Sequence, residues 1–265
     1  MIKVVVAGAA GRMGQESCRA ILRADGMELV GAVDKNSSGE ELEKVIAMDG
    51  VELTIQSDLD TTLKETKPDV VVDFTNPNVV FNNAQIALQN KVRPVIGTTG
   101  LTGEQIAQLK ELAQKQQLGG LIVPNFAIGA LLMIKFASIA VKYFPHVEII
   151  ELHHDQKMDA PSGTALKTAE VLAEIRGNMR QGLPTEFEKI PGSRGGDFEG
   201  MRVHSVRLPG FVAHQEVIFG GTGQTLTIRH DSISRESFMP GLLMGIHKVM
   251  EIDHLVYGLE NLIFE

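Results

Sequence analysis

The stretch that decides the fold is KVVVAGAAGRMG, residues 3–14. A run of β-branched residues leads into Gly8, Gly11 and Gly14, and the residues that follow carry apolar side chains at helical spacing. Glycines between a strand and a helix allow a sharp turn, a close approach of the backbone to a pyrophosphate, and tight packing of the helix on the strand. The helix N-terminus adds partial positive charge. The stretch therefore predicts a dinucleotide-binding turn, spaced G-x-x-G-x-x-G instead of the common G-x-G-x-x-G.

An acidic residue stands where such a turn requires one. Asp34 ends the second predicted strand, twenty residues after Gly14, and can accept a hydrogen bond from an adenosine ribose. Asp34 favours the 2′-hydroxyl of NADH, whereas Lys35 and Arg12 suit the 2′-phosphate of NADPH, so we predict use of both cofactors. An ordinary strand–helix turn without a ligand is the alternative. The contacts predicted here are Gly8, Ala9, Ala10, Gly11, Arg12, Met13, Asp34 and Lys35.

Two later turns are predicted to complete the cofactor site. They follow the fourth and fifth predicted strands, at the carboxyl ends where a doubly wound sheet binds ligands. Their hydroxyl and carboxamide groups suit a nicotinamide ribose and amide, although each turn alone could be a plain loop. Residues 73–77 end at the same edge and are assigned no role. The predicted contacts are Gly97, Thr98 and Thr99 in one turn and Val123, Pro124, Asn125 and Phe126 in the other.

Short apolar runs alternate with amphipathic stretches through the first half of the chain. This alternation indicates βαβ units, and therefore an α/β protein with a Rossmann-type doubly wound parallel sheet. The predicted strands cover residues 3–7, 28–33, 70–74, 94–97 and 120–123, and the predicted helices cover residues 13–24, 78–89 and 104–117.

The pattern changes in the second half. Consecutive strands without intervening helices indicate a separate α+β domain with an open mixed sheet. Its predicted strands cover residues 147–152, 202–208, 214–219 and 225–230, and its predicted helices cover residues 126–144 and 164–175. A long mobile loop is expected at residues 177–200, and a last helix at residues 237–251.

Composition limits the class of partner. The 265 residues include 25 Lys+Arg and 33 Asp+Glu, for a formal net charge of -8. We therefore expect neither nucleic acid nor an anionic membrane as a partner, since both bind basic surfaces. The single cysteine, Cys18, excludes a disulfide framework and a C-x-x-C zinc site and suits a reducing compartment. Residues 1–7 do not resemble a secretory leader and the longest apolar stretch, residues 126–141, is too short for a bilayer span, so a cytoplasmic location is expected.

The densest chemistry of the chain lies in ELHHDQKMDAPSGT, residues 151–164. His153 and His154 end a predicted strand and Lys157 follows closely, so groups able to donate a proton near neutral pH stand together. The alternative is that the two histidines are a solvated strand end. Two histidines with no third ligand at a suitable spacing make a poor metal site, so no metal is predicted.

The helix that follows this strand begins with Ser162, Gly163 and Thr164. Its backbone N–H groups and hydroxyls, together with the helix N-terminus, can bind a carboxylate, and these three residues are predicted to bind substrate. The alternative is that Ser162 only caps the helix.

Taken together, these motifs resemble the dihydrodipicolinate reductases, also named 4-hydroxy-tetrahydrodipicolinate reductases, which are bacterial and plant enzymes of lysine and diaminopimelate synthesis. The resemblance spans essentially the whole chain. It is carried by GAAGRMG (8–14), DFT (73–75), GTTG (97–100), PNF (124–126), the HH…APSGTA segment (153–165), VAHQEV (212–217) and RHDS (229–232).

This resemblance implies an NAD(P)H-dependent reduction of 4-hydroxy-tetrahydrodipicolinate, a cyclic dicarboxylate, to tetrahydrodipicolinate. It also implies a homotetramer in which the open sheets of the second domain join between subunits, and a C-terminal helix that returns to the first domain. The expected domains are residues 1–126 with 237–265, which bind the dinucleotide, and residues 127–236, which bind substrate and form the tetramer.

The resemblance also implies roles for single residues. His153 would be the acid/base residue, Lys157 the proton donor and His154 a substrate contact, while Gly163-Thr164 would bind a substrate carboxylate. The family often has a basic pair between the second histidine and the lysine, where this chain has Asp155-Gln156. That departure removes positive charge near a dianionic substrate and bears on substrate affinity.

Two other functions fit parts of the sequence. A semialdehyde dehydrogenase would need a thiol nucleophile, and Cys18, in the helix after the glycine turn, is expected to be core packing. A redox-sensing module would bind NAD(H) without turnover, and it gives no reason for the cluster at residues 153–164.

Overall fold

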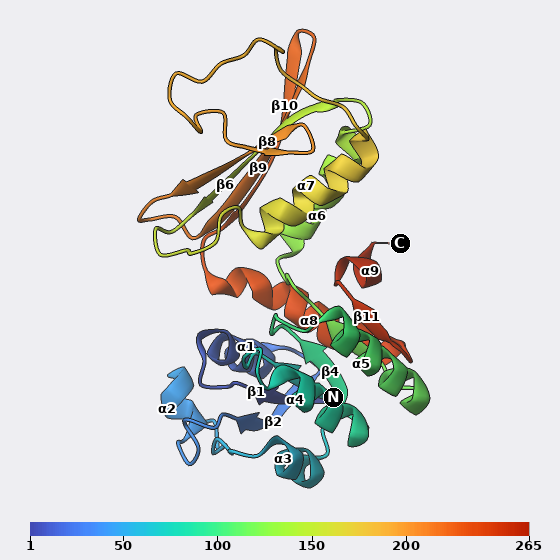
Figure 1. The fold of residues 1–265 in the computed structure, drawn as a ribbon. Coiled ribbons are helices and arrows are strands. Elements are labelled where there is room, and N and C mark those ends of the chain that lie inside the picture. The colour runs from blue at the N-terminus through green and yellow to red at the C-terminus, as the bar shows by residue number, and fades with distance from the viewer. Residues whose placement is uncertain (265) are drawn as a thin grey trace. The chain divides into compact units, whose positions relative to one another are not determined.

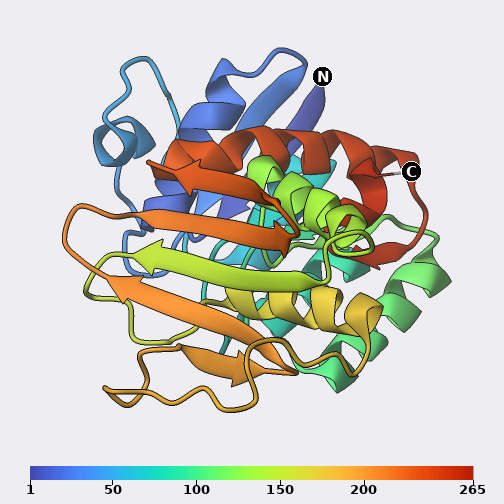
Figure 2. The same cartoon turned by 90° about the horizontal axis from the view of Figure 1, so that it is seen from above.

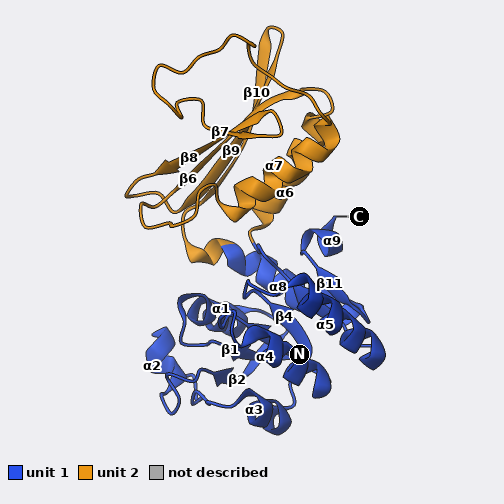
Figure 3. Cartoon of the chain, viewed as in Figure 1, with its two compact units in different colours: residues 1–126, 238–265 blue, residues 127–237 orange. Residues whose placement is uncertain are grey.

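The computed structural model describes residues 1–264, which form two compact units (Figure 1). Of the described residues, the first contains 1–126 and 238–264, and the second contains Ala127–Ser237 (Figure 3). The chain therefore enters the second unit once and returns to the first. The second crossing lies one residue after the domain boundary expected from the sequence.

The first unit is built on a six-stranded parallel sheet with the order β11-β5-β4-β3-β1-β2. Its strands are nearly all apolar because both faces of such a sheet are covered by helices. The strands are β1 (Ile2–Ala7), β2 (Met27–Val33), β3 (Val70–Asp73), β4 (Arg93–Ile96), β5 (Gly120–Ile122) and β11 (Leu255–Tyr257).

Helices pack on this sheet through their apolar faces. The apolar side chains of α3 (Leu59–Thr66), α4 (Val80–Gln89) and α5 (Gly103–Gln116) form two buried clusters with the strands. α1 (Arg12–Arg23) lies beside α8 (Met239–Lys248). The short elements α2 (Leu42–Ile46), η2 (Val249–Glu251) and α9 (Glu260–Ile263) complete the unit, and η1 (Arg235–Phe238) lies at the crossing between the two units.

The second unit has a mixed five-stranded sheet with the order β10-β9-β6-β8-β7 (Figure 2). β6 and β8 are parallel, and the other neighbours are antiparallel. Helices α6 (Ile128–Ala140) and α7 (Gly163–Arg176) pack against one face. The strands are β6 (His146–His153), β7 (Gly196–Phe198), β8 (Met201–Arg207), β9 (Ala213–Gly221) and β10 (Gln224–Ser232).

These elements confirm the predicted fold class and correct several details. The helix expected over 126–144 covers only Ile128–Ala140, and the loop expected over 177–200 contains β7. The helix expected over 237–251 is divided into η1, α8 and η2, with proline in the first turn of α8. The short elements α2, α3, α9 and β11 were not predicted, because runs of three to eight residues give little periodicity to detect.

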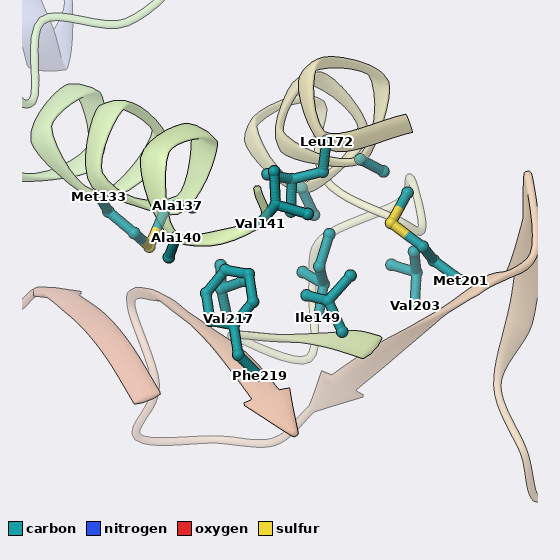
Figure 4. Packing of buried hydrophobic residues seen from close by; sticks show 13 residues of the cluster. Met133, Ala137, Ala140, Val141, Ile149, Leu172, Met201, Val203, Val217 and Phe219 are labelled. Atoms are coloured by element: carbon teal, nitrogen blue, oxygen red, sulfur yellow. The ribbon is translucent and has the colours of Figure 1, made fainter. Parts of the chain in front are cut away.

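The core of the second unit lies between the sheet and its two helices (Figure 4). Phe219 of β9 is fully buried there, beside Val217 and Ile149 from the sheet and Met133 and Ala137 from α6. This packing holds the sheet, and with it the strand β6 that carries a residue predicted to be catalytic, against its two helices.

Phe219→Ala should lower the free energy of unfolding by about 3–5 kcal/mol, because the change removes a buried ring and leaves a cavity. Urea unfolding followed by circular dichroism measures this loss. The matched control is Phe187→Ala, whose ring is 76% exposed and whose loss should cost about 0.5 kcal/mol or less. Equal losses in the two variants would contradict the description of this core.

Candidate active site

The turn between β1 and α1 requires glycine at two positions. Gly8 has φ +80, and a Cβ on it would collide with the carbonyl oxygen of Phe74. A Cβ on Gly14 would collide with the carbonyl oxygen of Gly8. The glycines therefore let helix α1 and the residues after β3 approach the turn closely, as the sequence pattern predicted.

The N-terminus of α1 is open to an anion. Its N-cap residue, Gly11, has extended backbone and supplies no side-chain hydrogen bond to the first turn. By contrast, Thr102 caps α5 and Ser162 caps α7 with their hydroxyls. N–H groups without a side-chain cap, with the helix dipole behind them, suit a phosphate, and the exposed guanidinium of Arg12 adds a full charge. This donor set fits the pyrophosphate of a dinucleotide.

Asp34 is held at the edge of this turn. Its Oδ2 accepts from the Ala10 N–H at 3.2 Å, and its Oδ1 accepts from the Asn36 N–H at 3.0 Å. The carboxylate is thus fixed beside the glycines with lone pairs to spare, where a ribose hydroxyl can donate to it. Lys35 follows it and is exposed.

A buried carboxylate that had no predicted role, Asp73, organises the next turn. Asp73 is 3% exposed and accepts from the Thr75 and Thr98 hydroxyls, both at 2.7 Å, and from the Asn83 amide at 2.8 Å. Its carbonyl oxygen accepts from the Gly97 N–H at 2.9 Å. The Thr98 hydroxyl is therefore engaged by Asp73, and Thr99 is the exposed hydroxyl of this turn.

Only two of the four residues predicted to contact a cofactor at the turn after β5 have accessible side chains. Val123 and Phe126 are buried, and the ring of Phe126 contacts that of Phe74 at a centroid distance of 5.7 Å. Pro124 is exposed and Asn125 is half-buried. Of these four residues, only Pro124 and Asn125 have side chains accessible to a ligand.

In the second unit, one carboxylate joins three elements. Glu151 on β6 is fully buried and is contacted by His153 Nδ1. Arg207 on β8 donates to it twice, from Nη2 to Oε1 at 2.7 Å and from Nη1 to Oε2 at 2.9 Å. The backbone N–H of Ser162, at the start of α7, donates to Oε1 at 3.3 Å.

This contact decides which nitrogen of His153 carries a proton. Burial alone would raise the pKa of Glu151, but hydrogen bonds from His153, Arg207 and Ser205 lower that pKa to about 2. An ionised carboxylate can only accept, so Nδ1 of His153 donates to it. Nε2 is then the ring nitrogen available for proton exchange with a substrate.

Lys157 is held by the loop that carries it. Its Nζ donates to Asp159 Oδ1 at 2.6 Å, and the hydrogen bond from Lys157 lowers the pKa of Asp159. Arg207 Nη2 also donates to the Asp159 carbonyl oxygen at 2.8 Å, which ties this loop to the Glu151 cluster. His154 is exposed.

The three residues predicted to bind a carboxylate lie at the N-terminus of α7. Ser162 is 4% exposed, and its hydroxyl accepts from the Ala165 N–H at 3.2 Å, so it caps the helix and retains a hydrogen to donate. A Cβ on Gly163 would meet nothing within 4 Å, and Gly163 is exposed. Backbone N–H groups at this end are therefore accessible to an anion.

No role was predicted from the sequence for Asp73, Glu151 or Arg207. Glu151 lies two residues before His153, and alternate residues of a strand share a face, so a charged residue within the apolar run of β6 was a usable signal. Arg207 gave no signal, because only the sheet register places it opposite His153.

Two absences concern residues 1–264. No group of three or more His, Cys, Asp or Glu side chains there is arranged to hold a metal ion. Within the same described part of the chain, no helix is both long and apolar enough to traverse a bilayer.

Comparisons with known proteins identify the family of this chain. Residues 2–126 match the family model "Dihydrodipicolinate reductase, N-terminus", and residues 129–263 match "Dihydrodipicolinate reductase, C-terminus". Two relatives are named 4-hydroxy-tetrahydrodipicolinate reductase. The one from Desulfitobacterium hafniense is 55% identical over 98% of both chains, and the one from Oceanobacillus iheyensis is 54% identical over 99% of both.

A solved structure shares the whole fold. The dipicolinate-bound dihydrodipicolinate reductase from Paenisporosarcina sp. TG-14 is 50% identical, with a TM-score of 0.91 over 99% of this chain and 100% of that one. An aspartate semialdehyde dehydrogenase from Vibrio cholerae is 11% identical with a TM-score of 0.55, over 95% of this chain and 98% of that one, which shows a shared fold alone. The chain belongs to the dihydrodipicolinate reductase family.

Proposed function

We propose that His153 and Lys157 manage the protons, and that the glycine turn and the N-terminus of α7 bind the two anionic ligands, in the reaction of this family. The chain is an oxidoreductase of lysine and diaminopimelate biosynthesis that reduces 4-hydroxy-tetrahydrodipicolinate to tetrahydrodipicolinate with a pyridine nucleotide. The observation that carries the assignment of roles is the Glu151–His153 contact, because it leaves Nε2 of His153 to exchange the proton.

The first unit would hold the cofactor through backbone and charge. The open N-terminus of α1 and Arg12 would bind the pyrophosphate, and Asp34 would accept from the adenosine ribose. Thr99 and Asn125 would contact the nicotinamide half. The bound nicotinamide supplies the hydride.

The second unit would hold the substrate. A solved relative carries dipicolinate, a planar pyridine dicarboxylate, which supports a cyclic dicarboxylate as the substrate here. One carboxylate would accept from the N–H groups of Gly163 and Thr164 and from the hydroxyl of Ser162, with His154 as a further contact. Gln156 Nε2 donates to Asp155 Oδ2 at 3.1 Å. Both residues are exposed, and neither adds positive charge.

The reaction requires more than one proton transfer, so both His153 and Lys157 have a part in it. Elimination of water protonates the leaving hydroxyl and releases one proton from the adjacent ring carbon, and the single hydride that is then added is matched by one proton on the neighbouring atom of the conjugated system. Nζ of Lys157 donates to Asp159 Oδ1, and Nε2 of His153 is the ring nitrogen that Glu151 does not engage, so these two atoms are the ones assigned to the proton transfers.

The thiol-dependent alternative has no support in the structure. Cys18 is fully buried, and burial raises its pKa to about 12. Such a thiol is not available as a nucleophile near neutral pH.

His153→Gln and Lys157→Met should each lower kcat by about 10²–10⁴-fold, the range for loss of a general acid or base. Affinity for NADH, measured by quenching or enhancement of its fluorescence, should persist, because the residues proposed to hold it lie in the other unit.

Matched controls are His146→Gln, at the opposite end of β6, and Lys167→Met, on α7; both positions are exposed. These two variants should keep the parent rate. Near-normal turnover in His153→Gln and Lys157→Met would overturn the roles proposed here.

We also propose that both NADH and NADPH are used. Asp34→Ala should lower kcat/KM for NADH relative to NADPH, since it removes the ribose acceptor, and Lys35→Ala should shift the ratio the opposite way. Steady-state kinetics with both cofactors measures these ratios. A parent preference above about 100-fold, about 2.7 kcal/mol, would contradict dual use.

A homotetramer in the cytoplasm is proposed as the working form. Half-buried apolar side chains on β6 and β9, including Ile150, Leu152 and Ile218, alternate away from the face that packs against α6 and α7. Sedimentation should give about four times the chain mass of 28.8 kDa, and a mass of one chain at micromolar concentration would contradict the proposal.

A further inference from the structure

Glu151 is the one charged residue among the fully buried side chains of the described chain. Besides Ser205 on β8, the groups that contact it are His153, Arg207 and the Ser162 N–H. His153 shares its strand, Arg207 lies on the neighbouring strand β8, and the Ser162 N–H begins α7. A carboxylate in this position is costly to bury unless its partners are satisfied and fixed.

Arg207 compensates the burial of the Glu151 charge, and it links Glu151 to the loop that carries Lys157 and Asp159, here called the lysine loop. Its two Nη atoms reach both oxygens of Glu151, a bidentate geometry that fixes the plane of the carboxylate. The same Nη2 donates to the Asp159 carbonyl oxygen, and Asp159 in turn accepts from Lys157. One ion pair therefore fixes His153 and contacts the backbone of the loop that carries Lys157.

We infer that Glu151 and Arg207 are positioning residues for the reduction: Glu151 holds His153 with Nε2 as its proton-exchanging atom, and Arg207 keeps Glu151 ionised and in place. The inference rests on the proposed role of His153. The charged groups that face Glu151 are Arg207 and His153, with Lys157 and Asp159 one contact further out. Gln215, opposite Glu151 on β9, donates to Thr168 at 2.8 Å.

Glu151→Gln tests this inference, since it keeps the shape of the side chain and removes its charge. kcat should fall by about 10²-fold or more, because a carboxamide at this position cannot both accept from His153 and match the donors of Arg207. The basic limb of the kcat/KM profile should also move to lower pH, since a buried anion that favours a protonated neighbour is gone. A role confined to stability would lower the melting temperature without moving that limb.

The matched control lies three residues earlier on the same strand. Glu148 accepts from Arg194 Nη2 at 2.7 Å and from His204 Nε2 at 2.8 Å, so it has the same kinds of partner away from the site. Glu148→Gln should leave kcat and its pH profile at parent values. If Glu148→Gln and Glu151→Gln changed kcat equally, the inference would be wrong.

Arg207→Met gives a second readout that does not depend on the first variant folding. Without the arginine, burial raises the pKa of Glu151 from about 2, so the carboxylate protonates as pH falls and can no longer hold His153 in the same way. The loss of kcat/KM should therefore be larger at about pH 6 than at about pH 8. A loss that is the same at both pH values would overturn the role given to Arg207.

A double-variant cycle separates this inference from the proposed function. In a His153→Gln background, Glu151→Gln should cause little further loss of kcat, because both changes remove the same proton transfer. Full additivity would overturn the inference while leaving His153 catalytic. An active His153→Gln enzyme would instead overturn the proposed function itself.

Discussion

The hydrogen bonds between the buried Glu151 carboxylate and the Arg207 guanidinium hold together the chemistry of the second unit. Removing one partner of such a pair typically costs about 3–5 kcal/mol, because the remaining charge stays buried without compensation. The positions of Glu151 and Arg207 are therefore fixed, and the groups that hydrogen-bond to them are held in place. His153 is fixed through Nδ1, α7 through the Ser162 N–H, and the lysine loop through the Asp159 carbonyl oxygen.

In the first unit, close backbone approaches determine the shape of the glycine turn. A Cβ at Gly8 or Gly14 would collide with a neighbouring carbonyl oxygen, so the turn exists only with glycine at both positions. The Asp73 carboxylate fixes the neighbouring turn by accepting hydrogen bonds from Thr75, Thr98 and Asn83. The result is a rim whose N–H groups and exposed hydroxyls are fixed before a ligand arrives, which lowers the ordering cost of binding.

The sequence predicted those features that depend on local pattern. The strand–glycine–helix turn and the alternation of strands and helices each lie within short windows of sequence. What escaped prediction depends on pairing between distant residues. Arg207 meets Glu151 across 56 positions, and Thr98 meets Asp73 across 25. Residue type alone could not tell that the Thr98 hydroxyl is engaged while Thr99 is exposed.

Two ion pairs, Glu151–Arg207 and Lys157–Asp159, use part of the positive charge of this acidic chain. A chain with a formal net charge of -8 must bind two anions, yet two of its cations near the substrate site already have carboxylate partners. The two pairs differ in burial. Glu151 is fully buried, so Arg207 stays neutralised, whereas Asp159 has a side chain that is 60% exposed. An exposed pair is worth about 1 kcal/mol or less, so the Lys157–Asp159 contact costs little to break. The second unit thus combines a buried ion pair, which fixes the groups bound to it, with an exposed ion pair that can open at little cost.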